Sequence, residues 1–210
     1  MIILVIDIGG TSMKIGVSGR DDRLKIPSGP KLTPDKMMVG VNEATKGWKH
    51  DVVSIGYPGP VVGGKPAEEP KNLASGWVGF DFEKAFGKPV RIVNDAAMQA
   101  LGSYRRGRML FLGLGTGLGS ALVVEGILQP MELAHLPYRN DRTYEDYVGL
   151  RGYERLGKKK WQLHVEKVVE LFKHSLQADY VILGGGQAKR LNGLPPGAQL
   201  GNNTNAIVGG

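Results

Sequence analysis

The chain has 210 residues, of which 41% are hydrophobic and 22% are charged, a composition that argues against disorder and fibrous architecture. It contains no cysteine, which excludes disulfides, thiolate zinc sites and a cysteine nucleophile. No apolar run approaches the ~18 residues of a membrane helix, so we expect a cytoplasmic protein without membrane contact. The formal net charge of +7 is spread over both halves without a basic domain or tail, so nucleic acid is not an expected partner.

The first half of the chain predicts short strands separated by glycine-rich turns. Pro34 and the spacing of the apolar residues after it predict an amphipathic helix. Asn94 and Asp95 stand where the last of these strands ends, and can cap the helix of about a dozen residues that follows. The strands are expected at residues 2–7, 13–18, 23–27, 51–57 and 89–93.

The second half predicts strands first and helices afterwards. Residues 109–128 read as two apolar strands around a glycine turn. Helical patterns follow near residues 143–155 and 158–177. A strand at 180–186, a short helix from Gln187 and a polar tail complete the chain.

Two segments, VIDIGGTSMKIGV and FLGLGTGLGSALV, share the plan of strand, Gly/Thr turn and strand. Their threonines, Thr11 and Thr116, lie half the chain length apart. This spacing predicts two half-chains with one supersecondary plan. The alternative is a coincidence between two glycine hairpins.

Both turns suit the binding of a phosphate chain, because glycine permits converging backbone N–H groups and a close approach. Neither turn has the P-loop pattern or the dinucleotide fingerprint, which counts against a nicotinamide or flavin enzyme. The LGGG segment that contains Gly185 is a third candidate for an anion or nucleotide. The candidate residues of the two turns are Gly9, Gly10, Thr11, Gly115, Thr116 and Gly117.

Five further polar residues are candidates for chemistry. Asp7 can hold Mg²⁺ against phosphate oxygens or cap its own loop, and Lys14 can reach the same phosphates or lie exposed on its strand. Asp95 can accept a hydroxyl proton during phosphoryl transfer or cap a helix. Glu132 and His135 form an E-x-x-H pair that is catalytic, hydrogen-bonding or metal-binding, the last being the poorest interpretation without a second histidine or a cysteine.

Seven short motifs follow one another between residues 7 and 186: DIGGT with Lys14, GYPGPV, KNL…W, PVRIVNDA, LGLGTGLGSAL, ELAHLPY and VILGGG. In this order the chain resembles the ROK family of sugar kinases. The short chain, the LPY after His135 and the RLGKKKW segment (155–161) are similar to its polyphosphate glucokinase branch.

The resemblance implies an α/β, actin-like (ribonuclease H-like) ATPase fold with two lobes around a central cleft. Residues 1–95 would form the lobe with the first phosphate loop and the catalytic Asp95, and residues 96–210 the lobe with the second phosphate loop and the donor region. It implies that Asp95 is the general base, and that the two Gly/Thr turns bind phosphate. The implied sugar ligands are Asn72, Asn94, Glu132 and His135.

Three departures from the family pattern concern the sugar site. The family's zinc-binding cysteine cluster would fall near residues 147–154, which contain no cysteine, so we expect no zinc. Glu154 is a candidate for the third glutamate of the sugar site, although its spacing differs from the family pattern by one residue. Alanine replaces the glycine that usually precedes His135.

The function expected from this resemblance is transfer of a phosphoryl group to the 6-hydroxyl of glucose or a related hexose, with Mg²⁺ as cofactor, in a homodimer. The alternative is a non-catalytic sugar- or nucleotide-binding member, either a regulator or a binding module. The donor is polyphosphate, ATP or both, and we expect polyphosphate to be used at least as well as ATP. Two basic clusters, Arg105, Arg106 and Arg108 and Lys158–Lys160, are either solvated faces or a track for polyphosphate.

Overall fold

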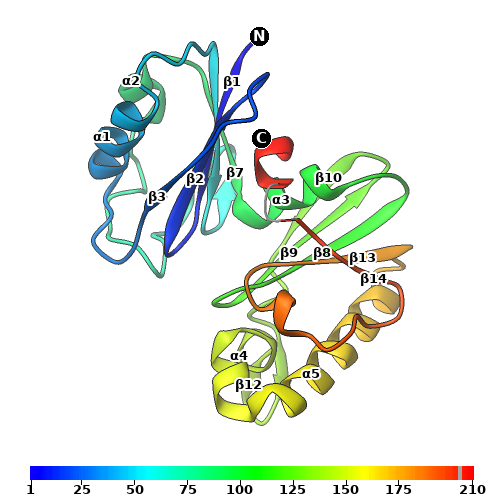
Figure 1. Cartoon of the computed structure of the whole chain (residues 1–210). Coiled ribbons are helices and arrows are strands. Elements are labelled where there is room, and N and C mark those ends of the chain that lie inside the picture. The colour runs from blue at the N-terminus through cyan, green and yellow to red at the C-terminus, as the bar shows by residue number, and fades with distance from the viewer. Residues whose placement is uncertain (203–204) are drawn as a thin grey trace. The chain divides into compact units, whose positions relative to one another are not determined.

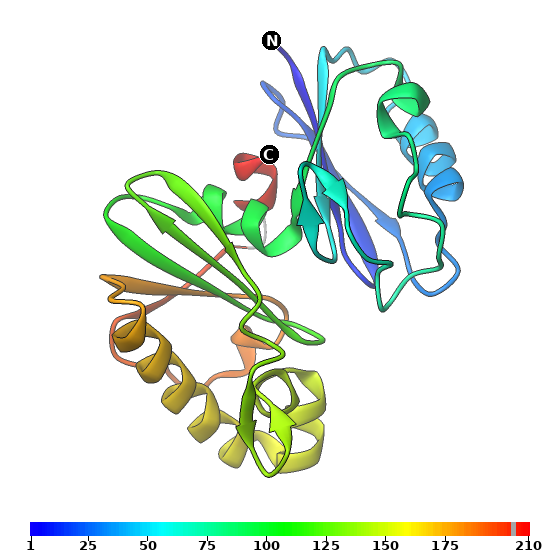
Figure 2. The same cartoon turned by 180° about the vertical axis from the view of Figure 1, so that it is seen from behind.

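The computed structural model describes residues 1–202 and 205–210, and the chain divides into two compact units (Figures 1 and 2). Unit 1 consists of Met1–Met98 with Ala206–Val208 and Gly210, and unit 2 of Gln99–Asn205 with Gly209. The functional assignment of residues 1–95 and 96–210 to two lobes stays a prediction.

Unit 1 contains a five-stranded sheet in the order β3-β2-β1-β4-β7. The pairs β1–β4 and β4–β7 are parallel, whereas β2 is antiparallel to both of its neighbours. The carboxyl ends of β1, β4 and β7 therefore meet at one edge of the sheet. The strands are β1 (Ile3–Ile8), β2 (Ser12–Val17), β3 (Arg23–Pro27), β4 (Val52–Tyr57) and β7 (Val90–Asn94).

Alternate residues of β1 face opposite sides of this sheet, as the two-residue period of a strand requires. Leu4, Ile6 and Ile8 pack in the cluster of α1 (Pro34–Ala44) and α2 (Phe82–Phe86), and Figure 1 shows these two helices on the same side of the sheet. Val5 faces the other side, where it packs against Met98 of α3 (Asp95–Ser103) and against α6 (Asn205–Gly209). A small hairpin, β5 (Val61–Val62) and β6 (Lys65–Pro66), follows β4.

Unit 2 contains a second five-stranded sheet, in the order β10-β9-β8-β13-β14. Its alternate leucines Leu110, Leu112 and Leu114 pack with Val165 and Val168 of α5, which lies along this face of the sheet (Figure 2). The strands are β8 (Arg108–Leu114), β9 (Leu118–Val124), β10 (Ile127–Met131), β13 (Tyr180–Gly184) and β14 (Ala198–Leu200). The other elements are the hairpin β11 (Pro137–Arg139) and β12 (Arg142–Thr143), α4 (Glu145–Val148), α5 (Leu150–Ser175) and the 3₁₀ turn η1 (Ala188–Arg190).

The two sheets have the same plan, which confirms the predicted internal repeat. In each sheet the first strand pairs antiparallel with the second, and the second with the third. On its other side the first strand pairs parallel with the fourth, and the fourth with the fifth. The strand that precedes the first Gly/Thr turn, β1, therefore occupies the same place in its sheet as β8, which precedes the second.

Two helical segments were predicted, near residues 143–155 and 158–177, and this prediction is largely confirmed. The helix α5 covers most of both ranges and has a break between them at Gly157, where φ is 73° and ψ is 160°. The prediction of a polar tail is wrong, since residues 198–200 form β14 and α6 follows. Ala206 and Ile207 of α6 are buried against Val5, a contact that local sequence pattern does not reveal. Among the described residues, no helix is long and apolar enough to cross a membrane.

Candidate functional site

Three predicted site residues lie at the carboxyl edge of the first sheet. The register pairs Asp7 with Gly56 and Tyr57 with Asn94, so the ends of β1, β4 and β7 are level. Asp95 follows Asn94 as the first residue of α3. Ligands of open α/β sheets commonly bind outside the carboxyl ends of the parallel strands, which makes this edge the natural candidate site of unit 1.

The carboxylate of Asp7 is paired with the neighbouring strand. Lys14, its register partner on β2, places Nζ 2.9 Å from Asp7 Oδ2. Asp7 is only 3% exposed, and a buried carboxylate requires such a partner. The pair thus combines a carboxylate with a half-exposed cation beside the first glycine turn.

The first Gly/Thr turn is fixed by its own backbone and by β3. Gly9 N–H donates to Ser12 O at 3.1 Å, and Ser28 donates from its hydroxyl to Gly9 O and from its backbone N–H to Thr11 O. A Cβ atom on Gly10 would lie 3.2 Å from Asn72 Cβ. The structure therefore brings the predicted sugar ligand Asn72 against the first predicted phosphate turn.

Asn94 caps α3, so the capping interpretation holds for this residue. Its Oδ1 accepts from the N–H groups of Ala96 at 2.9 Å and Ala97 at 3.3 Å. Its Nδ2 donates to Gly59 O at 3.0 Å, which ties the Pro-Gly-Pro loop to the helix start. Asp95 Oδ1 also accepts from Ala96 N–H, at 2.7 Å, and this contact orients the partly buried carboxylate.

The second Gly/Thr turn lies between β8 and β9 in unit 2. Leu150, at the start of α5, donates its N–H to Gly115 O at 3.0 Å and to Thr116 O at 3.2 Å. Gly185 has φ 81°, and a Cβ atom there would lie 2.3 Å from Leu114 O. Because β8 and β13 are parallel, the predicted phosphate residues Gly115, Thr116 and Gly185 come to one edge of the second sheet.

Glu132 and His135 follow β10 in the same unit, and both are exposed. The hydroxyl of buried Ser120 donates to Met131 O at 3.0 Å and accepts from Leu133 N–H at 3.1 Å. Ser120 thus fixes the backbone on both sides of Glu132, a positioning role that the sequence did not indicate.

Glu145 is a candidate site residue that the sequence did not identify. Its Oε1 lies 3.9 Å from His135 Nδ1 and 3.0 Å from Arg151 Nη2. A Cβ atom on Gly117 would lie 2.3 Å from Glu145 Oε2, so this carboxylate also contacts the second turn. Glu154, the candidate for the third glutamate, is instead exposed on α5.

Asp146 supports the helix start that carries Glu145. Its Oδ2 accepts from the backbone N–H of Thr143 at 3.1 Å and from the Thr143 hydroxyl at 2.9 Å. The backbone hydrogen bond from Thr143 is the main cause that holds the pKa of Asp146 below its usual range. The ionised Asp146 therefore anchors the β12–α4 connection beside the site.

The two basic clusters lie in different parts of unit 2, and a polyphosphate track formed by both stays a prediction. Arg108 begins β8 and Gly115 follows its end, a separation of roughly 20 Å at about 3.3 Å per residue. At that far end the backbone N–H of Arg108 donates to Asp179 Oδ2 at 2.8 Å, and its Nη1 donates to Leu176 O at 3.3 Å. Lys158–Lys160 lie on α5 just after Gly157, on the side of the turn.

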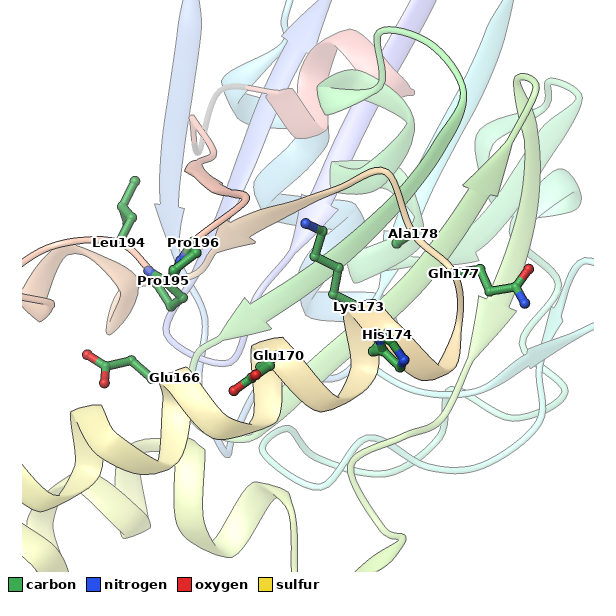
Figure 3. A pocket seen from close by; sticks show the side chains of 9 residues that line it. All are labelled: Glu166, Glu170, Lys173, His174, Gln177, Ala178, Leu194, Pro195 and Pro196. Atoms are coloured by element: carbon green, nitrogen blue, oxygen red, sulfur yellow. The ribbon is translucent and has the colours of Figure 1, made fainter.

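A cavity of ≈ 850 Å³ lies between the second half of α5 and the loop before β14. Figure 3 shows Glu166, Glu170 and Lys173 on the helix opposite Leu194 and its two following prolines. This cavity lies along the half of α5 that is farther from Leu150 and the second turn, so it is separate from the predicted site.

The predicted site residues divide between the two units. Among the described residues, no group of three or more His, Asp or Glu side chains has the arrangement of a metal site. The group in unit 1 comprises Asp7, Gly9, Gly10, Thr11, Lys14, Asn72, Asn94 and Asp95, and the group in unit 2 comprises Gly115, Thr116, Gly117, Glu132, His135 and Gly185.

Comparison with known proteins finds similar sequences among the polyphosphate glucokinases. The chain is 27% identical over 213 residues to the polyphosphate glucokinase of Mycobacterium tuberculosis, which covers 91% of this chain and 80% of the relative. It is 26% identical over 234 residues to the polyphosphate glucokinase of Mycobacterium leprae, which covers 97% of this chain and 72% of the relative.

Solved structures extend the likeness to the fold. The inorganic polyphosphate/ATP-glucomannokinase from Arthrobacter sp. strain KM matches with a TM-score of 0.83 and 25% identity, over 99% of this chain and 96% of that one. A ROK family glucokinase from Streptomyces griseus, solved with glucose and AMPPNP, matches with a TM-score of 0.74 and 18% identity, over 100% and 97%. The α/β fold is thus the actin-like ATPase fold that the resemblance implied. The sequence model of the ROK family matches residues 3–130, and the chain belongs to the ROK family.

Proposed function

We propose that the chain is a hexose kinase that transfers a phosphoryl group from polyphosphate or ATP to the 6-hydroxyl of glucose. The observation that carries the proposal is the carboxyl edge of the first sheet, where the Asp7–Lys14 pair, the first glycine turn and Asp95 stand at the ends of adjoining strands. The polyphosphate glucokinases and the glucomannokinase among its relatives support the same substrates.

Asp95 is the proposed general base. The glucose 6-oxygen forms a bond to the terminal phosphorus of the donor, and the bond from that phosphorus to the bridging oxygen breaks. The hydroxyl proton passes to the Asp95 carboxylate, and the shortened polyphosphate or ADP leaves with the electron pair of the broken bond. The hydrogen bond from Ala96 N–H to Oδ1 orients the carboxylate for this transfer.

The proposed sugar ligands are polar side chains at the two sheet edges: Asn72, Asn94, Glu132 and His135, joined by Glu145. Hydroxyl groups of a hexose need both donors and acceptors, and amides, carboxylates and an imidazole supply both. The contact of Glu145 with the second turn supports placing it with these ligands.

Phosphate binding is assigned to the turns Gly9–Thr11 and Gly115–Gly117, with Lys14 and Gly185. The chemistry of Asp7 fits Mg²⁺, because this ion commonly binds one or two carboxylates together with substrate phosphates. Asp7 would hold Mg²⁺, which supplies charge neutralisation at the donor phosphates when it is bound. A homodimer and a cytoplasmic location remain predictions from the sequence.

A coupled assay of glucose 6-phosphate formation tests the proposal, with glucose and with either polyphosphate or ATP as donor. Turnover with at least one donor, abolished in Asp95→Asn while glucose binding persists, supports the kinase. Glucose binding without turnover with either donor would instead support the alternative, a non-catalytic binding module.

A further inference from the structure

Three exposed cations of unit 2, Lys158, Lys159 and Arg190, are called here the basic strip. We infer that the basic strip binds the part of a long polyphosphate that extends beyond the second glycine turn. The inference rests on the proposed function, because it names the residues that a long donor would contact and a short donor would not.

Local contacts connect the segment that carries Arg190 to the second turn and to α5. Gln187 N–H donates to Leu114 O at 2.9 Å, so the segment that leads from β13 into η1 lies beside the end of β8, where the second turn begins. Arg190, the last residue of η1, places its guanidinium 4.5 Å from the ring centre of Tyr153 on α5. Asn192 N–H then donates to Gln162 Oε1 at 2.9 Å, which holds this segment against α5.

Lys158 and Lys159 border a recess of ≈ 370 Å³, together with Gln162 and Asn192. The two lysines come from α5 just after its break at Gly157, whereas Asn192 comes from the segment after η1. The recess therefore joins the lysines to the chain that carries Arg190.

These cations are available to a ligand. Within residues 1–202 and 205–210, no ion pair engages Lys158, Lys159 or Arg190. The stacked guanidinium of Arg190 still presents N–H groups at its edge, which suit phosphate oxygens. One carboxylate, Glu166, also lines the recess and limits its positive charge.

The separation between the second turn and the basic strip determines which anions the strip can bind. Leu150 touches the second turn, and the helical segment from Leu150 to residue 156 alone spans roughly 9 Å at about 1.5 Å per residue, with the break at Gly157 before Lys158. Exposed charges are largely screened beyond about 10 Å at 0.1 M salt. The strip therefore contributes little to three phosphates at the turn, and contributes to a chain long enough to reach it.

The test compares the double variant Lys158→Gln/Lys159→Gln with the control Arg105→Gln/Arg106→Gln. Both remove two exposed charges from unit 2, but the control residues lie just before β8, at the end of that strand opposite the second turn. The strip variant should raise the KM for long-chain polyphosphate about threefold to tenfold, and should leave the KM values for tripolyphosphate and ATP unchanged. Adding Arg190→Gln should raise the long-chain KM further.

A second measurement does not need activity. Direct titration of long-chain polyphosphate should show weaker binding to the strip variant, and its dependence on log[salt] should be shallower by about 1 to 1.5. Equal losses for tripolyphosphate and long chains, or equal losses in the control, would overturn the strip. Wild-type protein that binds long chains through the strip but phosphorylates no glucose would overturn the proposed function alone.

Discussion

Asp95 is both the first residue of α3 and a residue of the candidate site, because it directly follows the carboxyl end of β7. Replacing it with Asn keeps an oxygen that can accept the Ala96 N–H, so α3 should retain its start. The amide is a far weaker base, so kcat should fall by at least about 10²-fold. Steady-state kinetics and thermal unfolding check this together, and near-normal turnover in the folded variant would remove Asp95 from the role.

Glu145 and Glu154 offer a matched comparison at the sugar site. Glu145→Gln should raise the KM for glucose about tenfold or more, as should Glu132→Gln and His135→Ala, because hydrogen bonds to sugar hydroxyls exist in the ground state. Glu154→Gln should leave the KM unchanged, since Glu145 is the glutamate that lies beside His135 and the second turn. An effect of Glu154→Gln alone would contradict the assignment drawn from the structure.

The sequence identified a site residue only where that residue belongs to a recognisable motif. Asp7 and Lys14 come from one strand-turn-strand segment, and the register makes them partners. Glu145 comes from the start of a four-residue helix after an unpredicted hairpin, and no local pattern marks its approach to His135. Identifying Glu145 as a neighbour of His135 therefore requires the three-dimensional path of residues 137–144.

Among the elements, the connection from β13 to η1 depends on one glycine conformation. Gly185→Ala should lower the free energy of unfolding by about 1–3 kcal/mol and raise the KM for the donor, because φ is 81° and Leu114 O occupies the place of a Cβ. Gly186→Ala is the control, since a Cβ there meets open space. Denaturant unfolding and donor kinetics measure both variants, and equal effects would refute the special place of Gly185.

Elements with a strong local signal were predictable and the others were not. The apolar strands and the break at Gly157 follow from periodicity and a glycine. The hairpins β5–β6 and β11–β12 have two or three residues per strand, too short for a periodic pattern. The helix α6 exists through its contact with Val5, which is distant in sequence.

At the scale of the whole chain, the repeat of one sheet plan was readable from two similar turns, whereas the return of the C-terminal segment to unit 1 was not. Ile207→Ala should destabilise unit 1 by about 2–4 kcal/mol, because Ile207 is 8% exposed in the cluster of Val5 and Met98. Val208→Ala, at a position that is 72% exposed, should change stability by less than about 0.5 kcal/mol. Calorimetry of both variants checks this, and equal unfolding temperatures would contradict the packing of α6.

The membership of Ala206 and Ile207 in unit 1 has a consequence for synthesis on the ribosome. Val5 and Met98 are made early, but the helix that covers them is added only after the whole of unit 2. At about 5–20 residues per second, unit 2 takes roughly 5–20 s to translate. During that interval the nascent first unit lacks the helix that covers Val5 and Met98, so this apolar face stays uncovered until translation ends.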